Sequence, residues 1–358
     1  MTVTPPLTAV RTSTRPRLFT PGPVEIPVRI LRALSQVPPH HRTEVFRETY
    51  KRVSDDLRWV HQTQGEVLML AASGTGAMEA AVVNLMEPGK KALCLIGGKF
   101  GERWANICKA YGVPYEVIET PWGHAVPVSD VERRLDDDPK ISTVFGTHSE
   151  TSTATLHDAH ALAKATRARS RRIVLDAITS LGVHPLPQDE WGVDVVVTGS
   201  QKGLMSPPGS ATVSLAPWAL DAIEGERQPR FYWDLRKARK NLPSGESAFT
   251  PAVSLVFAVG EALTMMKEEG LANVHARHAR LERGDQAAPR HPRHHRRGRT
   301  GPYEGQDAPH RPHGRLRPLR RLRDPRRARG MHGGAGAEGL GCGRGGAARV
   351  GIGVRESA

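Results

Sequence analysis

Three short segments of the chain each place a polar or reactive side chain where an apolar run ends. In VVVTGSQKGLMSPPG, residues 195–209, Lys202 follows a run of valines and is surrounded by small residues and prolines. A lysine at the end of a buried strand is partly desolvated, which lowers the pKa of its amine. Such an amine is a candidate for a Schiff base with a carbonyl compound. The alternative is a lysine whose ammonium group extends into solvent.

The second segment is RRIVLDAITSLG, residues 171–182, in which Asp176 ends an apolar run. A carboxylate buried at that position costs several kcal/mol unless it meets a cation. Asp176 is therefore a candidate partner for a protonated ring nitrogen. The alternative is a carboxylate that caps the next helix.

The third segment is ASGTGAMEAA, residues 72–81, where small residues separate an apolar run from a helical pattern. Free backbone N–H groups and the positive end of the helix dipole make such a turn an anion site. The small side chains allow a phosphate to approach the backbone, and Thr75 adds a hydroxyl. A Gly-Thr turn without a ligand is the alternative.

Together the three segments fit one cofactor. Pyridoxal 5′-phosphate needs an anion site for its phosphate, an acid partner for its pyridine nitrogen and an amine for its aldehyde. The turn at 74–77, Asp176 and Lys202 supply these groups, and the small residues near Lys202 leave room for a flat ring. The Lys202 amine is then the group that moves a proton at the substrate α-carbon.

The elements that position these segments alternate along the chain. Helical spacing is found over 44–62, 77–86 and 99–112, and continuous apolar runs over 66–72, 91–98, 171–177 and 193–200. Apolar strands between amphipathic helices predict an α/β fold with a mostly parallel sheet covered on both faces. Such sheets bind ligands beyond the carboxyl ends of their strands, so the three segments should meet at one edge.

The formal net charge of +14 on 358 residues is concentrated at the end of the chain. From Glu282 onward there are 18 arginines and only 7 acidic residues. This segment is too poor in large apolar residues to offset its ordering entropy, which predicts disorder. Our leading hypothesis is a frameshifted or misread terminus. The rival is a basic tail that binds nucleic acid, which we do not expect because it lacks the interleaved aromatics of single-strand binders.

The remaining composition excludes several classes. Three scattered cysteines, Cys94, Cys108 and Cys342, indicate a reduced, cytoplasmic setting without a zinc site. Five histidines between His275 and His295 lack cysteine or carboxylate partners at ligand spacing, so we expect no metal. The N-terminus has no apolar signal region, and no run approaches the roughly 20 residues of a membrane span.

Seven segments of the chain resemble one known enzyme family. The segments LFTPGPVEIP, ASGTGAMEAAVVNLMEPG, GGKFGERWANICKAYG, THSETSTAT, VLDAITSLG, DEWGVDVVVTGSQKGLMSPPG and FTPAVSL resemble the class V aminotransferases of fold type I. The branch most similar is that of the alanine–glyoxylate and serine–glyoxylate aminotransferases, over residues 18–281. The resemblance implies a seven-stranded sheet and transfer of an amino group from serine or alanine to glyoxylate or a similar 2-oxo acid. Some bacterial relatives are labelled soluble hydrogenase subunits, but this sequence offers no ligands for a redox metal.

The resemblance also implies roles for single residues. Lys202 would bond to the cofactor aldehyde and Asp176 would pair with the pyridine nitrogen. The phosphate would lie on Gly74, Thr75, Gly76 and Ala77, with Gln201 beside them. Phe100 would stack on the ring, a core phenylalanine being the alternative, and Thr151 would bond near the phenolic oxygen. Thr250 would reach the phosphate of the partner subunit's cofactor, which implies a homodimer. Gly22 would lie beside the substrate, and His148 is either near the ligand or packed in its loop.

Four segments are expected along the chain: an irregular arm (1–19), a large cofactor-binding domain (20–258), a connecting helix (259–281) and the low-complexity tail (282–358). Two features depart from the family pattern. Ala154 stands where relatives have glycine, which costs about 1 kcal/mol if the position needs positive φ. No Arg-Ile-Gly motif for the substrate carboxylate occurs after residue 281.

Two alternatives to an active aminotransferase follow from these departures. One is a cofactor-binding remnant with impaired activity, because the substrate-binding domain is lost. The other is a lyase such as a cysteine desulfurase, which needs a cysteine on a mobile loop near the site.

Overall fold

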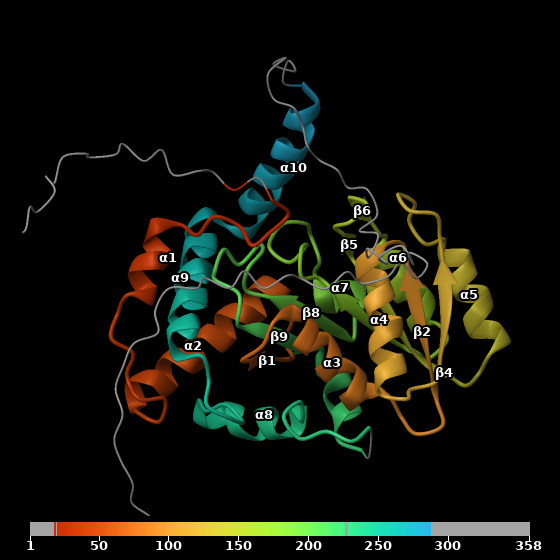
Figure 1. Ribbon diagram of the computed structural model, residues 1–358, viewed down its shortest axis with the longest axis horizontal. Coiled ribbons are helices and arrows are strands. Elements are labelled where there is room, and N and C mark those ends of the chain that lie inside the picture. The colour runs from red at the N-terminus through yellow and green to blue at the C-terminus, as the bar shows by residue number, and fades with distance from the viewer. Residues whose placement is uncertain (1–17, 19, 226–227, 288–358) are drawn as a thin grey trace, which may run out of the picture. The chain divides into compact units, whose positions relative to one another are not determined.

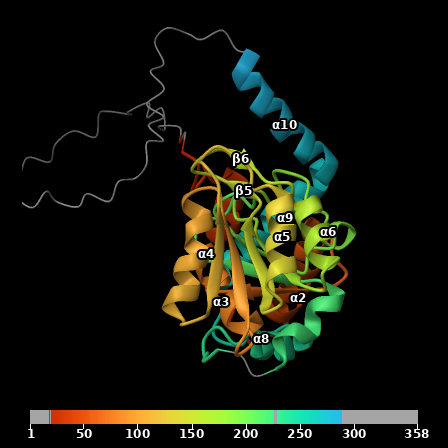
Figure 2. The same cartoon turned by 90° about the vertical axis from the view of Figure 1, so that its right-hand side faces the viewer.

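The computed structural model describes residues 18, 20–225 and 228–287, and a seven-stranded sheet forms the centre of this part (Figure 1). Its strand order is β1-β9-β8-β7-β4-β2-β3, and β9 alone runs antiparallel to the others. The strands are β1 (Glu66–Leu70), β2 (Lys91–Ile96), β3 (Tyr115–Glu119), β4 (Ile141–Thr147), β7 (Arg172–Asp176), β8 (Val195–Gly199) and β9 (Ala211–Leu215). A small antiparallel pair, β5 (Ser149–Glu150) and β6 (Thr155–Leu156), lies above the carboxyl ends of the strands (Figure 2). The predicted α/β fold with a mostly parallel sheet is confirmed.

Helices cover both faces of the sheet (Figure 2). On one face lie α3 (Gly74–Leu85) and α4 (Lys99–Ala110), and on the other α2 (Glu44–His61), α5 (Val128–Asp137), α6 (Ala159–Arg167) and α9 (Val253–Glu269). The remaining helical segments are α1 (Val28–Leu34), α7 (Gln188–Trp191), η1 (Pro217–Ile223), α8 (Leu235–Asn241), η2 (Leu242–Ser244) and α10 (Leu271–Ala287). Within these ranges no helix combines the length and apolar character that crossing a bilayer would require.

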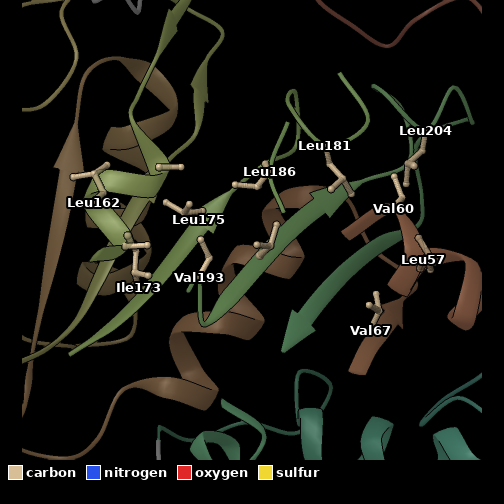
Figure 3. Close-up of a cluster of buried hydrophobic side chains, with 14 of the residues drawn as sticks. Leu57, Val60, Val67, Leu162, Ile173, Leu175, Leu181, Leu186, Val193 and Leu204 are labelled. Carbon is tan, nitrogen blue, oxygen red and sulfur yellow. The ribbon is translucent and has the colours of Figure 1, made fainter. Parts of the chain in front are cut away.

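Each central strand contributes side chains to two separate cores, because successive side chains of a strand point to opposite faces. In β7, Ile173 and Leu175 join the core under α2, α6 and α9, whereas Val174 joins the core under α3 and α4. Figure 3 shows the first core, with Leu162 of α6 lying over Ile173 and Leu175. Burial on both faces explains why the strands read as continuous apolar runs.

Some boundaries differ from the expected ones. Helix α3 begins at Gly74, so the small residues form its first turn and do not precede the helix. The expected boundary at 258 falls inside α9. That helix ends at Glu269, and Gly270, with φ of +82°, separates it from α10. Helix α10 continues through Ala287, beyond the expected end of the connecting helix at 281. The rest of the 282–358 tail, and the N-terminal arm except Leu18, lie outside the described residues.

Ala154, in the loop between β5 and β6, has φ of +56°. An L-residue with a Cβ is strained there, and glycine is not. We therefore expect Ala154→Gly to raise the free energy of unfolding by about 1 kcal/mol, measured from the urea midpoint. Ala161→Gly, inside helix α6, is the matched control and should lower stability by a similar amount. A destabilised Ala154→Gly variant would contradict this account of the loop.

Candidate active site

A cavity of about 210 Å³ lies at the carboxyl edge of the sheet, where β7, β8 and the first turns of α3 and α4 meet. Its lining residues are Ser73, Gly74, Thr75, Phe100, Arg103, Ser149, Thr151, Asp176, Ile178, Thr179, Gln201 and Lys202. The three segments singled out in the sequence therefore meet in one place. Phe100, Thr151 and Gln201, expected from the resemblance, line the same cavity.

Asp176 is the last residue of β7, paired in register with Thr147 of β4 and Val197 of β8. Its side chain is buried, and its Oδ1 accepts a hydrogen bond of 2.8 Å from the backbone N–H of Ile178. A turn follows, so Asp176 caps no helix. Burial raises the pKa of the Asp176 carboxyl to about 7, against the effect of its bond to Ile178 and of the Arg103 charge. A bound cation beside this carboxylate would offset the cost of its charge.

Lys202 lies three residues beyond the end of β8, the strand next to β7. Its Nζ donates a hydrogen bond of 2.8 Å to the carbonyl oxygen of Pro21. Burial lowers the pKa of the Lys202 amine, although Asp176 acts in the opposite direction. A second cavity, of about 270 Å³, also contains Lys202 and is lined mainly by apolar side chains such as Val24, Met205 and Met266. Lys202 thus borders both the cavity with Asp176 and an adjoining space.

Gly22 packs directly against the Lys202 side chain. A Cβ added at Gly22 would lie 2.5 Å from Lys202 Nζ, and its φ is +134°. We expect Gly22→Ala to displace the amine and to reduce cofactor attachment and turnover by about a hundredfold, because misplacement by about an ångström has that effect. Gly123→Ala is the control: Gly123 also has positive φ, at +91°, but nothing lies within 4 Å of an added Cβ. Equal losses in both variants would mean that backbone strain alone, and not crowding of Lys202, is responsible.

The first turn of α3 provides the expected anion site. Ser73 precedes the helix, and no side chain caps its N-terminus in the described part of the chain. Gly74 and Thr75 line the cavity, whereas Gly76 and Ala77, although expected in this turn, are buried and do not line it. An added Cβ at Gly76 would lie 2.6 Å from the Trp233 ring, so Gly76 serves packing.

Gln201 gives an independent indication that the site holds a ligand. Its Oε1 is buried and has no hydrogen-bond partner among the described residues. A buried polar atom without a partner is costly unless a ligand or water satisfies it. The Gln201 Oε1 atom needs a hydrogen-bond donor, whereas the uncapped helix turn and the buried Asp176 carboxyl fit a ligand that carries an anionic group and a protonated nitrogen.

Phe100 and Thr151 are both held in place by residues of β5 or next to it. The backbone N–H groups of Phe100 and Gly101 donate to Glu150 Oε2 at 3.0 and 2.9 Å, which fixes the start of α4. Phe100 therefore lines the cavity and is not a core residue. Thr151 Oγ1 donates to Thr179 Oγ1 at 3.2 Å, and Thr179 Oγ1 donates in turn to the Ser149 carbonyl oxygen.

Two other candidate residues lie outside this cavity. Thr250 lines a different one, of about 30 Å³, with Tyr50 and Tyr232. His148 is buried, its Nδ1 is 3.0 Å from Ser180 Oγ, and burial lowers its pKa to about 3. His148 is thus a packed loop residue, the second of the two interpretations.

The cysteines of the described residues do not reach the site. Cys94 and Cys108 are both buried, with their sulfur atoms 4.0 Å apart between β2 and α4, and neither lines the cavity. Neither supplies the cysteine on a mobile loop that a desulfurase-type lyase requires. Cys342 lies outside the described residues.

Sequence reasoning missed five lining residues: Ser73, Arg103, Ser149, Ile178 and Thr179. Arg103 had a detectable signal, because it lies three residues after Phe100 and so on the same face of a helix. Ile178 and Thr179 carry no such sequence signal, because they reach the cavity through the turn that follows Asp176.

The class-V aminotransferase family model matches residues 29–288 of the chain. The chain belongs to this family. Among curated relatives of this class-V aminotransferase, the small subunit of a soluble hydrogenase from Synechococcus sp. is 44% identical over 73% of this chain and 69% of its own length. An L-aspartate–glyoxylate aminotransferase from Paracoccus denitrificans is 36% identical over 73% and 67%. A serine–glyoxylate aminotransferase from Methylorubrum extorquens is 35% identical over 76% and 70%.

A solved structure gives the same relationship. The aspartate aminotransferase of subgroup IV from Thermus thermophilus aligns with a TM-score of 0.68 and 40% identity, covering 73% of both chains. Membership of this family implies a transaminase that uses pyridoxal phosphate. The Lys202 amine, the Asp176 carboxyl and the first turn of α3, which share the cavity, fit that cofactor. No group of three or more histidine, cysteine, aspartate or glutamate side chains suited to a metal ion is found in the described residues of this class-V aminotransferase.

Proposed function

We propose that the chain moves an amino group from a small amino acid, serine or alanine, to glyoxylate or a similar 2-oxo acid, with pyridoxal phosphate held at Lys202. The observation that carries this proposal is the single cavity shared by Lys202, Asp176 and the first turn of α3. An amine of lowered pKa, a buried carboxyl and an anion site are the three groups that this cofactor needs.

Each residue then has a defined task. The bound cofactor supplies an electron sink for the charge that develops at the substrate α-carbon. The Asp176 carboxylate holds the proton on the ring nitrogen, and Phe100 flanks the flat ring. The turn at Gly74 and Thr75, with Gln201, binds the phosphate and fixes the orientation of the ring. The Lys202 amine, whose pKa burial lowers, would take the proton from the substrate α-carbon and deliver it to the C4′ carbon of the cofactor.

The names of the relatives support glyoxylate as the acceptor, whereas the cavity lining supports the choice of donor. The names of the Paracoccus and Methylorubrum relatives specify different amino donors, aspartate and serine, but both specify glyoxylate as acceptor. The cavity next to Lys202 is lined mainly by apolar side chains, with Glu25, Arg277 and His278 also present. Arg277 is already held by Glu269 through two hydrogen bonds of 2.7 and 3.0 Å. A small uncharged donor such as serine or alanine suits this lining better than aspartate.

The test follows the nitrogen atom. The purified full chain is incubated with pyridoxal phosphate, glyoxylate and ¹⁵N-labelled serine, alanine or aspartate, and labelled glycine is measured by mass spectrometry. We expect label in glycine from serine or alanine, and the visible spectrum of the cofactor should change with the donor alone. Cofactor binding without label transfer would contradict the proposal and favour the impaired remnant. Transfer from aspartate alone would contradict the donor assignment.

We also propose a homodimer. Thr250 lies away from the cavity of its own subunit, beside a patch where Phe231 is 72% exposed and Tyr232 stacks on Phe249 with 5.0 Å between ring centroids. Exposed aromatic clusters of this kind mark protein–protein contacts. A second copy seated on this patch is the arrangement in which Thr250 reaches a neighbouring site.

We expect Phe231→Asp to convert the dimer to a monomer in light scattering after size-exclusion chromatography, because burying a carboxylate in the interface is costly. Trp122→Asp, at a 40% exposed residue outside the patch, should leave the dimer intact. A wild-type chain that is monomeric at micromolar concentration would refute the dimer.

A further inference from the structure

Arg103 is a cavity residue to which the proposed function assigns no task. It lies on α4, one turn after Phe100, and both side chains line the cavity. The centre of its guanidinium group is 4.8 Å from the Phe100 ring centroid. Its Nη1 donates a hydrogen bond of 3.1 Å to Thr75 Oγ1 in the first turn of α3.

The guanidinium group of Arg103 forms no ion pair among the described residues, although its charge lowers the pKa of the Asp176 carboxyl in the same cavity. By contrast, Arg169, Arg172 and Arg277 each have an ion pair. Glu150, which is buried nearby, is already occupied by the backbone N–H groups of Phe100, Gly101 and Ser152. A partly buried cation that is held in no ion pair favours an anionic ligand.

The bond to Thr75 determines what the threonine hydroxyl can do. Because Thr75 Oγ1 accepts a hydrogen bond from Arg103, the hydroxyl proton must point elsewhere. It is then available to donate to a group that lies on the uncapped turn of α3. A guanidinium group that polarises a hydroxyl strengthens the bond which that hydroxyl donates.

We propose that Arg103 is a positioning residue for a phosphate group: it orients the Thr75 hydroxyl and supplies the positive charge of the phosphate site. This inference rests on the proposed function for the identity of the phosphate compound, pyridoxal phosphate. The Arg103 guanidinium group also contacts the Phe100 ring, and Phe100 forms the wall of the cavity against which the cofactor ring would lie.

The test compares pyridoxal phosphate with pyridoxal, which lacks only the phosphate. Arg103→Met removes the charge and keeps much of the aliphatic packing. We expect Arg103→Met to weaken binding of pyridoxal phosphate by about tenfold to a hundredfold and that of pyridoxal by less than about twofold. Arg133→Met is the control, since Arg133 is 69% exposed and pairs with Asp130 on α5. Equal losses for both compounds, or no loss for either, would overturn the inference.

Two further measurements keep the outcome decisive. Combining Arg103→Met with Thr75→Val should weaken binding of pyridoxal phosphate by less than the product of the single effects, because both changes remove one linked interaction. Fully multiplicative effects would refute a role through Thr75. Arg103→Lys, with folding checked by circular dichroism, keeps the charge and should bind pyridoxal phosphate more tightly than Arg103→Met does; equal affinities of the two variants would refute the role of the charge.

Inorganic phosphate separates this inference from the proposed function. In a thermal unfolding assay without cofactor, phosphate should stabilise the wild-type chain and the Arg133→Met control, but not Arg103→Met. Sodium borohydride reduces a bond between the cofactor and a lysine and so makes it permanent. If this treatment leaves no cofactor on wild-type Lys202, the proposed function fails, and the phosphate measurement still decides the role of Arg103. Equal stabilisation of all three proteins by phosphate would refute that role.

Discussion

Replacing Lys202 by alanine is expected to abolish covalent attachment of the cofactor and to lower the rate of transamination by about 10³-fold or more. The amine performs two tasks, bonding to the cofactor and moving the proton at the α-carbon, and general acid–base catalysis alone contributes about 10²–10⁴-fold. The other lining residues offer no replacement, because Lys202 is the only lysine that lines this cavity in the described part of the chain.

The measurement combines chemistry and mass spectrometry. Sodium borohydride makes the bond between cofactor and lysine permanent, and peptide mapping then identifies the modified residue. Lys140→Ala is the matched control, since Lys140 is exposed at the opposite edge of the sheet, just before β4. Added methylamine should restore part of the activity of Lys202→Ala and leave Lys140→Ala unchanged. If another lysine carries the cofactor, the site assignment is wrong.

The sequence predicts those site residues that stand alone as polar residues at the end of an apolar strand. Asp176 and Lys202 follow apolar runs, and parallel strands bring their carboxyl ends to one edge whatever their order in the sheet. This is why the segments at 74–77, Asp176 and Lys202 meet, although the sequence alone leaves the strand order open. The antiparallel course of β9 was not foreseen, because a short apolar run carries no sign of its direction.

The start of helix α3 and the contact between Thr75 and Arg103 were not predicted, because both depend on tertiary packing and not on a local sequence pattern. Helix α3 begins at Gly74, although glycines have low helix propensity, because the first turn packs against the sheet between Ile178 and Trp233. Within this first turn Gly76 and Ala77 are buried and do not line the cavity. The contact between Thr75 and Arg103 joins positions 28 apart in sequence. Only the fold brings them together, so no local pattern reveals it.

The helix after Gly270 shows a different limit. Composition predicted the end of ordered structure at about 281, whereas α10 continues through Ala287. Four of the six residues from 282 to 287 (Glu, Arg, Gln and Ala) have good helix propensity, which lets the helix continue despite Gly284 and Asp285. Low apolar content argues against a packed core, but it does not by itself end a helix.

Asp176→Asn is expected to separate the activity of the chain from its stability. Without the carboxylate, the proton on the ring nitrogen is no longer held, and we expect turnover to fall by about 10²-fold to 10³-fold. The same carboxyl is buried, and its pKa in the folded protein, about 7, is raised above the ordinary value of 3.8. Ionising it therefore opposes folding.

The pH dependence of stability follows from the sign of that shift. Below pH about 4 the carboxyl is protonated in both the folded and the unfolded chain, and its burial has no ionisation cost. As the pH rises from about 4 to about 7, the unfolded chain loses the proton first, so the cofactor-free protein loses up to about 4 kcal/mol of stability. Asp176→Asn lacks this group, and its unfolding free energy should change less over the same range.

Urea unfolding at pH 5 and pH 8 without cofactor measures the difference, with the exposed Asp221→Asn as control. At pH 8 Asp176→Asn should be more stable than wild type, while at pH 5 the two should be closer. Pyridoxal phosphate should remove much of the wild-type loss at pH 8, because its protonated nitrogen supplies the cation that the carboxylate lacks. The charged Asp176 carboxylate destabilises the cofactor-free protein. Binding of a cationic ring beside it relieves that cost, and this relief favours binding. If wild type and Asp176→Asn show the same pH dependence, Asp176 is not the strained buried acid that the site requires.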